Sequence, residues 1–484
     1  MSNFTPAIPS KLETFILVLP GINKEAHTLS EQLILKNNKD FDIFINDKKF
    51  HNHFVHHLLA AYSFGANKEK LQEIFEIHAK TQRPIPSSIR KITRENYKEF
   101  LNQADAYTDF QFFFQSEIDA YGMVDTVRRW VWHGDFLARA FAGLLHPLIH
   151  IGHGLEFGVS SIVAEGLSLL ACTEASYSKI IPNLPELQVG SLIPVQVQSY
   201  ANNSGSSEKG WVNQWISKLS ETVSNLEISD PMALSTTATV AEKYDDDIDS
   251  HLSTIPPCLR ESKLLEMFIK IKQDSVFNGI VSHEEEDEFY KIFSNPHAVS
   301  RIKYYIQLWH MEQGQKDTQS KFKDLHLFSA LLLGATGFRK DYPEVIKLDF
   351  FLMHALTSSE FIHQYLARIT PSESTIFLLG QLASLIVAYI ASNRPALHVE
   401  SLLRYESPLD EVNINNPWTV LFEKSLDCKE VHVIKSVRSC AVGQVIHGHH
   451  PDACFSDIWL KVAKMCVDVN GNWTYGVGFD DEWK

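Results

Sequence analysis

Histidines in apolar segments are the residues of this sequence that most readily suggest chemistry. The first such segment is FHNHFVHHLLAAYSFGA, at residues 50–66. His53 and His57 stand four residues apart and share one face of a predicted helix. His57 lies within the apolar stripe of that face, whereas His56 points about a quarter turn away. Imidazoles held in such surroundings are candidate metal ligands.

A second segment repeats the pattern in FLARAFAGLLHPLIHIGHGLEFG, at residues 136–158. His146 and His150 are again four residues apart, a spacing that can present two imidazoles from one helix to one metal ion. Pro147 between them lacks a backbone donor, so we expect a kink there. His153 and Glu156 follow on the same stretch and are candidate catalytic groups, either as a third ligand or as partners of the ligands.

A third segment, PEVIKLDFFLMHALTSSEF at residues 343–361, places Lys347 seven residues before His354. In a helix these positions lie on nearly the same face, with about 10 Å of axial rise between them. A short carboxylate could hardly bridge that rise, but a lysine arm could. A buried lysine loses its charge readily, and the neutral amine can take up carbon dioxide as an anionic carbamate.

Spacing alone leaves a metal site and ordinary core packing equally open, because a single histidine on an apolar face is usually a satisfied core residue. Imidazole also suits iron, copper, zinc and nickel alike. GHGLEF at residues 152–157 begins like a dinucleotide-binding loop but ends in phenylalanine and follows a helical stretch, so no such loop is expected. HGHHPDAC at residues 447–454 is interpreted as a polar loop.

The elements that must position these residues are mostly predicted helices, so we expect an all-α fold. Apolar residues recur at helical spacing in residues 71–80, 125–145, 262–273 and 321–334. Short strands are predicted at residues 41–45 and 431–437. Surface loops are predicted at residues 201–210 and 241–250, where polar and acidic residues gather. We therefore expect one helical domain over residues 1–484, with its core at about 40–470.

Bulk composition narrows the classes of partner. The 484 residues carry a formal net charge of −15, which opposes binding to nucleic acid or to an anionic membrane surface. The apolar run at residues 376–391 is interpreted as a buried core helix, because a span needs about 20 apolar residues. The six cysteines form no CxxC pair and residues 1–12 lack the core of a signal peptide. A reducing cytosol is the expected compartment.

The order of three segments, HNHFVHHLLAAYSFGA, FAGLLHPLIHIGHGLEFG and KLDFFLMHALTSS, resembles the questin oxidase-like family. The resemblance implies an oxygenase that opens an oxidised aromatic ring of an anthraquinone-like polyketide with molecular oxygen. Some members are described as Baeyer–Villiger-type oxidases that use NADPH. A structural relative resembles a non-haem iron dioxygenase whose metal is held by four histidines and a carboxylated lysine.

Carried over to this sequence, the resemblance implies an Fe(II) site made by His57, His146, His150 and His354, with Lys347 as the carboxylated lysine. His53 and His56 remain alternatives to His57. His153 stands where a tyrosine is common in the family, which bears on the polarity of the pocket and the identity of the substrate. The expected partners are a small aromatic substrate and oxygen, and the Baeyer–Villiger-type members imply NADPH as a further cofactor. A metal-free NADPH-dependent monooxygenase and a non-catalytic helical binding protein remain alternatives.

Overall fold

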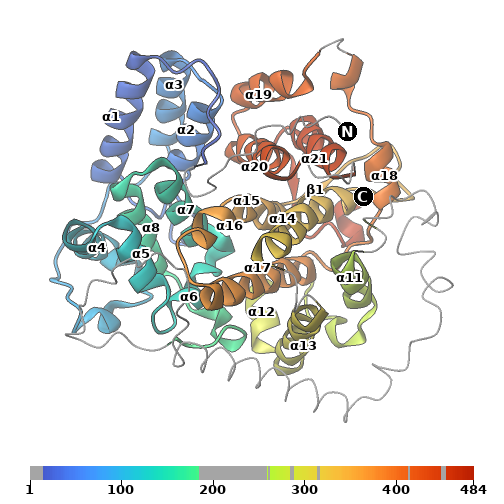
Figure 1. Ribbon diagram of the computed structural model, residues 1–484, viewed down its shortest axis with the longest axis horizontal. Coiled ribbons are helices and arrows are strands. Elements are labelled where there is room, and N and C mark those ends of the chain that lie inside the picture. Colours follow the sequence, from blue (N-terminus) through green and yellow to red (C-terminus); the bar gives the residue numbers. More distant parts are fainter. Residues whose placement is uncertain are drawn as a thin grey trace.

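The computed structural model describes residues 15–184, 259, 262–283, 288–312, 317–411, 415–448 and 454–484 (Figure 1). The predicted loops at 201–210 and 241–250, and most of the segment 447–454, lie outside these residues. Helices dominate the described chain, as the sequence predicted.

Residues 15–184 contain eight α-helices. They are α1 (Lys24–Asp40), α2 (Phe54–Ser63), α3 (Lys68–Ala79), α4 (Tyr107–Tyr121), α5 (Met123–Val131), α6 (Phe136–Ala140), α7 (His146–Phe157) and α8 (Ser160–Cys172). Short 3-10 turns join them: η2 (Tyr97–Phe100), η3 (Ala104–Ala106), η4 (Gly143–Leu145) and η5 (Ser176–Lys179). Helix α7 packs along α8, and α8 along α4. Figure 1 shows α1–α3 as one group above α4–α8.

The second part begins with α11 (Lys263–Gln273), α12 (Glu288–Ser294), α13 (Pro296–Glu312), α14 (Thr318–Ala335), α15 (Phe350–Ser359), α16 (Ile362–Leu366) and α17 (Pro371–Ala391). It continues with α18 (Val399–Arg404), α19 (Pro417–Asp427), α20 (Val431–His447) and α21 (Cys454–Val469). Its 3-10 turns are η8 (Ser275–Phe277), η9 (Pro408–Glu411) and η10 (Asp480–Trp483). Helix α15 contacts α7, α14, α17 and α20, so it runs through the middle of the molecule.

Helix α17 shows how the sequence defines one of these helices. The Thr370 side chain accepts a hydrogen bond from the Glu373 amide, and the Glu373 carboxylate accepts one from the Thr370 amide, which forms a capping box. Pro371 follows at the first helical position, where its missing N–H is not needed. Among the described helices, α17 alone is long and apolar enough to cross a membrane, and 94% of its most apolar window is buried inside the protein.

One parallel pair of two-residue strands is the only sheet in the described part of the chain. Strand β1 (Leu348–Asp349) pairs with β2 (Trp473–Thr474), with Asp349 opposite Thr474. The strand predicted at 431–437 is wrong, because those residues begin helix α20. The strand predicted at 41–45 is reduced to isolated bridges at Phe41 and Phe44.

The helix predicted over 125–145 is broken into α5, α6 and η4. Leu144 and Leu145 adopt positive φ values of 52° and 64°, which no helix allows. Pro147 therefore lies in the first turn of α7, and the kink expected within a longer helix is replaced by a new helix start. His146 is therefore the first residue of α7 and not a residue in the middle of a longer helix.

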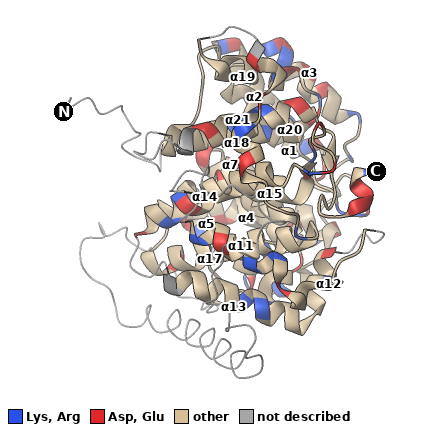
Figure 2. Cartoon of the chain, turned by 90° about the vertical axis from the view of Figure 1, so that its right-hand side faces the viewer, with Lys and Arg blue, Asp and Glu red and all other residues tan. Residues whose placement is uncertain are grey.

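Charged residues of both signs are mixed on the surface. Figure 2 shows Lys and Arg interspersed with Asp and Glu on helices such as α3. The negative net charge is therefore not gathered into one acidic face in this view.

Candidate metal centre

Four histidines from four separate elements meet in the interior. His53 directly precedes α2, His146 begins α7, His354 lies on α15 and His432 lies on α20. One nitrogen of each ring lies within 4.8 Å of the corresponding nitrogen of every other ring. We call these four residues the histidine cluster. They are the only group of this kind that the described residues form.

A hydrogen bond at the opposite nitrogen fixes the orientation of each ring. The Nδ1 atoms of His53, His146 and His354 bond to the carbonyl oxygens of His51 (2.7 Å), Gly143 (2.7 Å) and Phe350 (2.8 Å). The Nδ1 atom of His432 bonds to the Glu430 carboxylate at 2.5 Å. A carbonyl or carboxylate oxygen can only accept, so each Nδ1 is the donor. The bare Nε2 atoms of the neutral rings then face the shared centre.

The two closest rings of the histidine cluster, those of His53 and His146, have no proton between their facing nitrogens. His53 Nε2 lies 2.8 Å from His146 Nε2, and the tautomer just deduced gives both atoms a lone pair and no proton. Two lone pairs at that distance repel one another. The Nε2 atoms of His354 and His432 are buried and have no hydrogen-bond partner among the described residues. A cation at the common point would satisfy all four atoms.

Burial also keeps these rings neutral. Loss of solvent lowers the pKa of His53, His146 and His354 well below the ordinary value, with Lys435 among the cationic neighbours that lower it further. Burial lowers the pKa of His432 as well, against the opposing effect of its hydrogen bond to Glu430. Neutral imidazole is the form that binds a metal ion.

A buried lysine accompanies the histidine cluster. Lys435 lies one turn after His432 on α20 and is only 3% exposed. Burial lowers the pKa of Lys435 to about 7, although Glu430 partly opposes this. Its Nζ atom has no hydrogen-bond partner among the described residues. At pH 7 about half of the Lys435 amines are therefore uncharged, and the amine lies unpaired beside the histidine cluster.

Comparison with known proteins shows to which family the chain belongs. The model of the questin oxidase-like family matches residues 50–440, most of the chain. The chain belongs to the questin oxidase-like family. All four members of the histidine cluster and Lys435 lie within the matched range.

Relatives extend along almost the whole length of this questin oxidase-like protein. A Baeyer–Villiger monooxygenase of Cryptosporiopsis sp. is 23% identical, over 97% of this chain and 96% of its own. A Baeyer–Villiger oxidase of Emericella nidulans is 26% identical, over 94% and 92%. A questin oxidase of Aspergillus fumigatus is 22% identical, over 94% and 92%. The chain is thus an oxidoreductase by family.

Of the five metal ligands expected from the sequence, His146 and His354 lie in the histidine cluster, and His57 does not. His57 Nδ1 bonds to His78 Nε2 at 3.1 Å, on the side of α2 that faces α3. The alternative His53 reaches the cluster because it directly precedes α2 and is not tied to the apolar stripe of that helix.

His150 also lies apart from the cluster. Its Nε2 atom bonds to Glu165 at 2.9 Å, and its Nδ1 atom lies 3.1 Å from His56 Nε2. On α7, His150 lies four residues after His146, about 6 Å further along the helix axis, and its ring nitrogens face Glu165 and His56. His56, the other alternative to His57, is paired with His150 there.

Lys347 points to a different part of the molecule. Its amine donates to the Glu482 carbonyl, and it lies 5.8 Å from the centre of the Trp483 ring. Helix α15 begins only at Phe350, so Lys347 and His354 do not share a helix and the seven-residue spacing loses its meaning. Lys435 is the buried lysine near the histidines.

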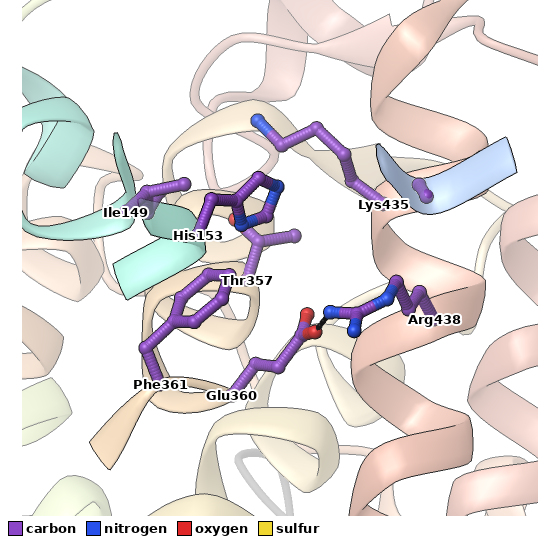
Figure 3. Close-up of a pocket in the computed structure, with 8 residues that line it drawn as sticks. Ile149, His153, Thr357, Glu360, Phe361, Lys435 and Arg438 are labelled. Atoms are coloured by element: carbon purple, nitrogen blue, oxygen red, sulfur yellow. Dashed lines mark ion pairs between the residues drawn. The ribbon is translucent and has the colours of Figure 1, made fainter. Parts of the chain in front are cut away.

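The candidate catalytic residues His153 and Glu156 lie further along α7 than His146, and Figure 3 shows His153 beside Lys435. His153 lines a small pocket with Lys435, Thr357 and Phe361. The pocket is too small to hold a water molecule. Neither ring nitrogen of His153 has a partner among the described residues, and burial lowers its pKa well below the ordinary value. Glu156 is instead held by Arg438, at 2.7 Å.

Sequence reasoning missed His432 and Lys435. The alternation VHVIKSV suggested a strand, and a strand would have put these two residues on opposite faces. The available signal was their three-residue spacing among Val433, Ile434 and Val437, which on a helix brings both polar groups to one face of a buried element.

Proposed function

We propose that this protein is an iron-dependent oxygenase that opens a ring of a polycyclic, anthraquinone-like polyketide. The observation that carries the metal site is the convergence of four Nε2 atoms, each backed by a hydrogen bond at Nδ1. The proposed substrate class rests on relatives that are named questin oxidase.

Four neutral nitrogen donors fit Fe(II), although they would also hold copper, zinc or nickel. Iron is proposed because the relatives are oxidases and monooxygenases. Fe(II) would supply the one-electron chemistry that lets molecular oxygen react with a closed-shell aromatic ring. His53, His146, His354 and His432 would hold it.

We propose Lys435, and not Lys347, for the carboxylated lysine that the family resemblance implies. Its neutral amine nitrogen would attack the carbon of carbon dioxide, forming an N–C bond and releasing one proton. The resulting carbamate would add an anionic oxygen to the four imidazoles. His153 faces the same pocket, and as a neutral ring it could donate an N–H to that oxygen.

The protein fixes the orientation of the imidazoles and restricts the access of water to this centre. The hydrogen bonds at Nδ1 hold each imidazole in one tautomer, so no proton rearrangement precedes metal binding. His146 and His354 are 3% and 0% exposed, so water has little access to the inner side of the cluster. Such surroundings strengthen electrostatic interactions with a bound phenolate or quinone.

Oxygen stoichiometry separates this proposal from a metal-free monooxygenase. Ring opening by a dioxygenase puts both oxygen atoms into the product. A monooxygenase inserts one atom, reduces the other to water and consumes one NADPH and one proton. No nucleotide-binding loop was found in the sequence, so NADPH could act as a diffusing reductant or through a partner reductase.

The test is elemental analysis of the purified protein, followed by turnover of questin under ¹⁸O₂ with and without NADPH. We expect one iron per chain and two labelled atoms in the product without NADPH. A protein without iron that inserts one labelled atom and consumes NADPH would establish the monooxygenase instead. A protein with neither iron nor turnover of questin would contradict the proposal.

A further inference from the structure

A series of buried polar groups begins at Glu165 on α8 and leads toward the histidine cluster. The Glu165 carboxylate accepts from the side-chain amide of Asn38 at 2.7 Å, and its other oxygen lies 2.9 Å from His150 Nε2. His150 Nδ1 lies 3.1 Å from His56 Nε2. Glu165, His150 and His56 are each no more than 2% exposed. Among the described residues, the carboxylate forms an ion pair with no lysine or arginine.

The Glu165 carboxylate fixes the direction of these hydrogen bonds. An ionised carboxylate can only accept, so His150 Nε2 is the donor. The Nδ1 atom of a neutral His150 ring is then an acceptor, and His56 Nε2 donates to it. His56 Nδ1 is left with a lone pair, and this buried atom has no partner among the described residues. The series therefore ends in an open acceptor for a proton.

His153 and Lys435 continue the series toward the cluster. The ring centroids of His56 and His153 lie 4.8 Å apart, with an interplanar angle of 77°. His153 and Lys435 line the same pocket, and Figure 3 shows the lysine arm reaching toward the His153 ring. Neither nitrogen of His153 has a partner among the described residues, and the same is true of Lys435 Nζ. Rotation of the His153 ring and of the lysine arm would join Lys435 to His56 by hydrogen bonds.

Carboxylation of Lys435 requires a proton acceptor of this kind. When the neutral amine attacks carbon dioxide, an N–C bond forms, an N–H bond breaks and one proton must leave the nitrogen. Lys435 and His153 are only 3% and 2% exposed, so bulk water has little access to that proton. A new carbamate anion would also add a buried negative charge to that of Glu165, which is unfavourable in an interior without water.

We propose that Glu165 accepts the proton that Lys435 releases on carboxylation. The transfer passes through the rings of His153, His56 and His150. This inference rests on the proposed function, in which Lys435 becomes the carbamate. Each ring receives a proton at one nitrogen and gives one up at the other, so the rings stay neutral and an O–H bond forms on Glu165. The single negative charge moves from Glu165 to the carbamate, and the number of buried charges does not change.

The same transfer prepares His153 to hold the carbamate. It reverses every hydrogen bond of the series, so that protonated Glu165 donates to His150 Nε2 and His153 presents an N–H toward Lys435. That N–H can donate to a carbamate oxygen. Glu165 is thus also a positioning residue, because its protonation decides which nitrogen of His153 carries the proton.

The test is infrared difference spectroscopy of the iron-loaded, oxygen-free protein on addition of ¹²CO₂ or ¹³CO₂. We expect the carbonyl band of a protonated carboxylic acid to appear together with the carbamate band. Only the carbamate band should shift with ¹³C, because the acid carbon belongs to the protein. Glu165→Gln should remove the acid band and lower the affinity for carbon dioxide by at least about tenfold, since an amide does not take up the proton.

The matched control is Glu400→Gln, which alters a glutamate that is 6% exposed on α18 and should leave both bands unchanged. An acid band or a carbon dioxide affinity that is unchanged in Glu165→Gln overturns the assignment of Glu165. If a melting curve shows that Glu165→Gln disturbs folding, His150→Gln interrupts the same series and should likewise remove the acid band. A wild type without a carbamate band overturns the carboxylation in the proposed function and this inference with it. A wild type that forms the carbamate without an acid band overturns this inference alone.

Discussion

His53 Nε2 and His146 Nε2 lie 2.8 Å apart, although the two residues are separated by 93 positions in the chain. Each ring donates its Nδ1–H to a backbone carbonyl, so the facing atoms are both acceptors. Such a contact is unfavourable without a cation or a proton between the rings. The fold nevertheless holds both rings there from the starts of two helices, α2 and α7.

Removing one of these rings should therefore remove the metal. We expect His53→Ala to lower iron affinity by at least about tenfold, because a lost ligand costs no less than a lost partner of a ligand. His57→Ala is the matched control, because His57 is a buried histidine four residues further along the same segment but bonds to His78. Elemental analysis and competition with a chelator provide the measurement. Equal iron loss in both variants would contradict the assignment.

The carboxylate behind His432 should matter almost as much as a ligand. Glu430 accepts from His432 Nδ1 and from Trp473 Nε1. We expect Glu430→Gln to weaken iron binding by about 10–100-fold, because the amide can still accept from Nδ1 but lacks the negative charge that makes the imidazole a stronger ligand. The exposed Glu423→Gln should change nothing. Chelator competition at constant pH measures both, and unchanged affinity in the first variant would argue against His432 as a ligand.

Lys435 and Lys347 make opposite predictions about carbon dioxide. We expect Lys435→Met to abolish both the response of activity to bicarbonate and a ¹³C carbamate signal after incubation with ¹³C-bicarbonate. Lys347→Met should retain both. In the wild type the Lys347 amine donates to the Glu482 carbonyl and lies over the Trp483 ring, away from the histidine cluster. A carbamate signal that survives Lys435→Met would assign the modification to another lysine.

The low pKa of Lys435 also predicts how stability depends on pH in the metal-free, bicarbonate-free protein. The unfolded chain holds the lysine proton up to pH about 10.5, but the folded chain releases it at about 7. Between these values the unfolded state binds more protons, so stability rises with pH. The shift corresponds to about 4–5 kcal/mol of destabilisation at pH 7, and this cost has largely disappeared at pH 10.

Lys435→Met removes this linkage. We expect the variant to be more stable than the wild type at pH 7 and the difference to shrink toward pH 10. Urea unfolding at several pH values measures the difference, with Lys347→Met as the control. A pH-independent difference between wild type and Lys435→Met would show that the amine is not uncharged in the folded protein.

The all-α fold class and two of the four residues of the histidine cluster could be predicted, because both depend on the spacing of apolar residues within short segments. His146 and His354 lie in apolar helical segments whose periodicity is evident in the sequence. The break at Leu144 and Leu145 was not evident, because their left-handed backbone depends on tertiary packing. That break makes His146 the first residue of α7, and the pairing of His150 with Glu165 and His56 depends on contacts between separate elements.

The remaining residues at the candidate site depended on pairings between distant parts of the chain. Whether Lys347 or Lys435 approaches the histidines follows from where α15 begins and from α15 packing against α20. The short alternation at 431–437 was compatible with either a strand or a helix, and burial of α20 on several sides favoured the helix. Local spacing contains no information about such contacts.

Arg438 presents a last test, one of stability and not of metal binding. The residue is 1% exposed and forms ion pairs with two buried carboxylates, Glu156 and Glu360. Its Nε atom also donates to Ser63 at 2.9 Å. We expect Arg438→Leu to cost about 3–5 kcal/mol of unfolding free energy, because it leaves two like charges buried without a cation.

Glu156→Gln provides the contrasting variant. Burial raises the pKa of Glu156, and the Arg438 guanidinium opposes that effect. The amide keeps an oxygen to accept from Arg438 and leaves a balanced pair between Arg438 and Glu360, so we expect a cost of about 1 kcal/mol or less. Urea unfolding at pH 7.5 measures both variants. If Glu156→Gln lowers the unfolding free energy as much as Arg438→Leu does, the main role of Arg438 is not to compensate the charges of the two carboxylates. Glu156 must then stabilise the fold through another residue.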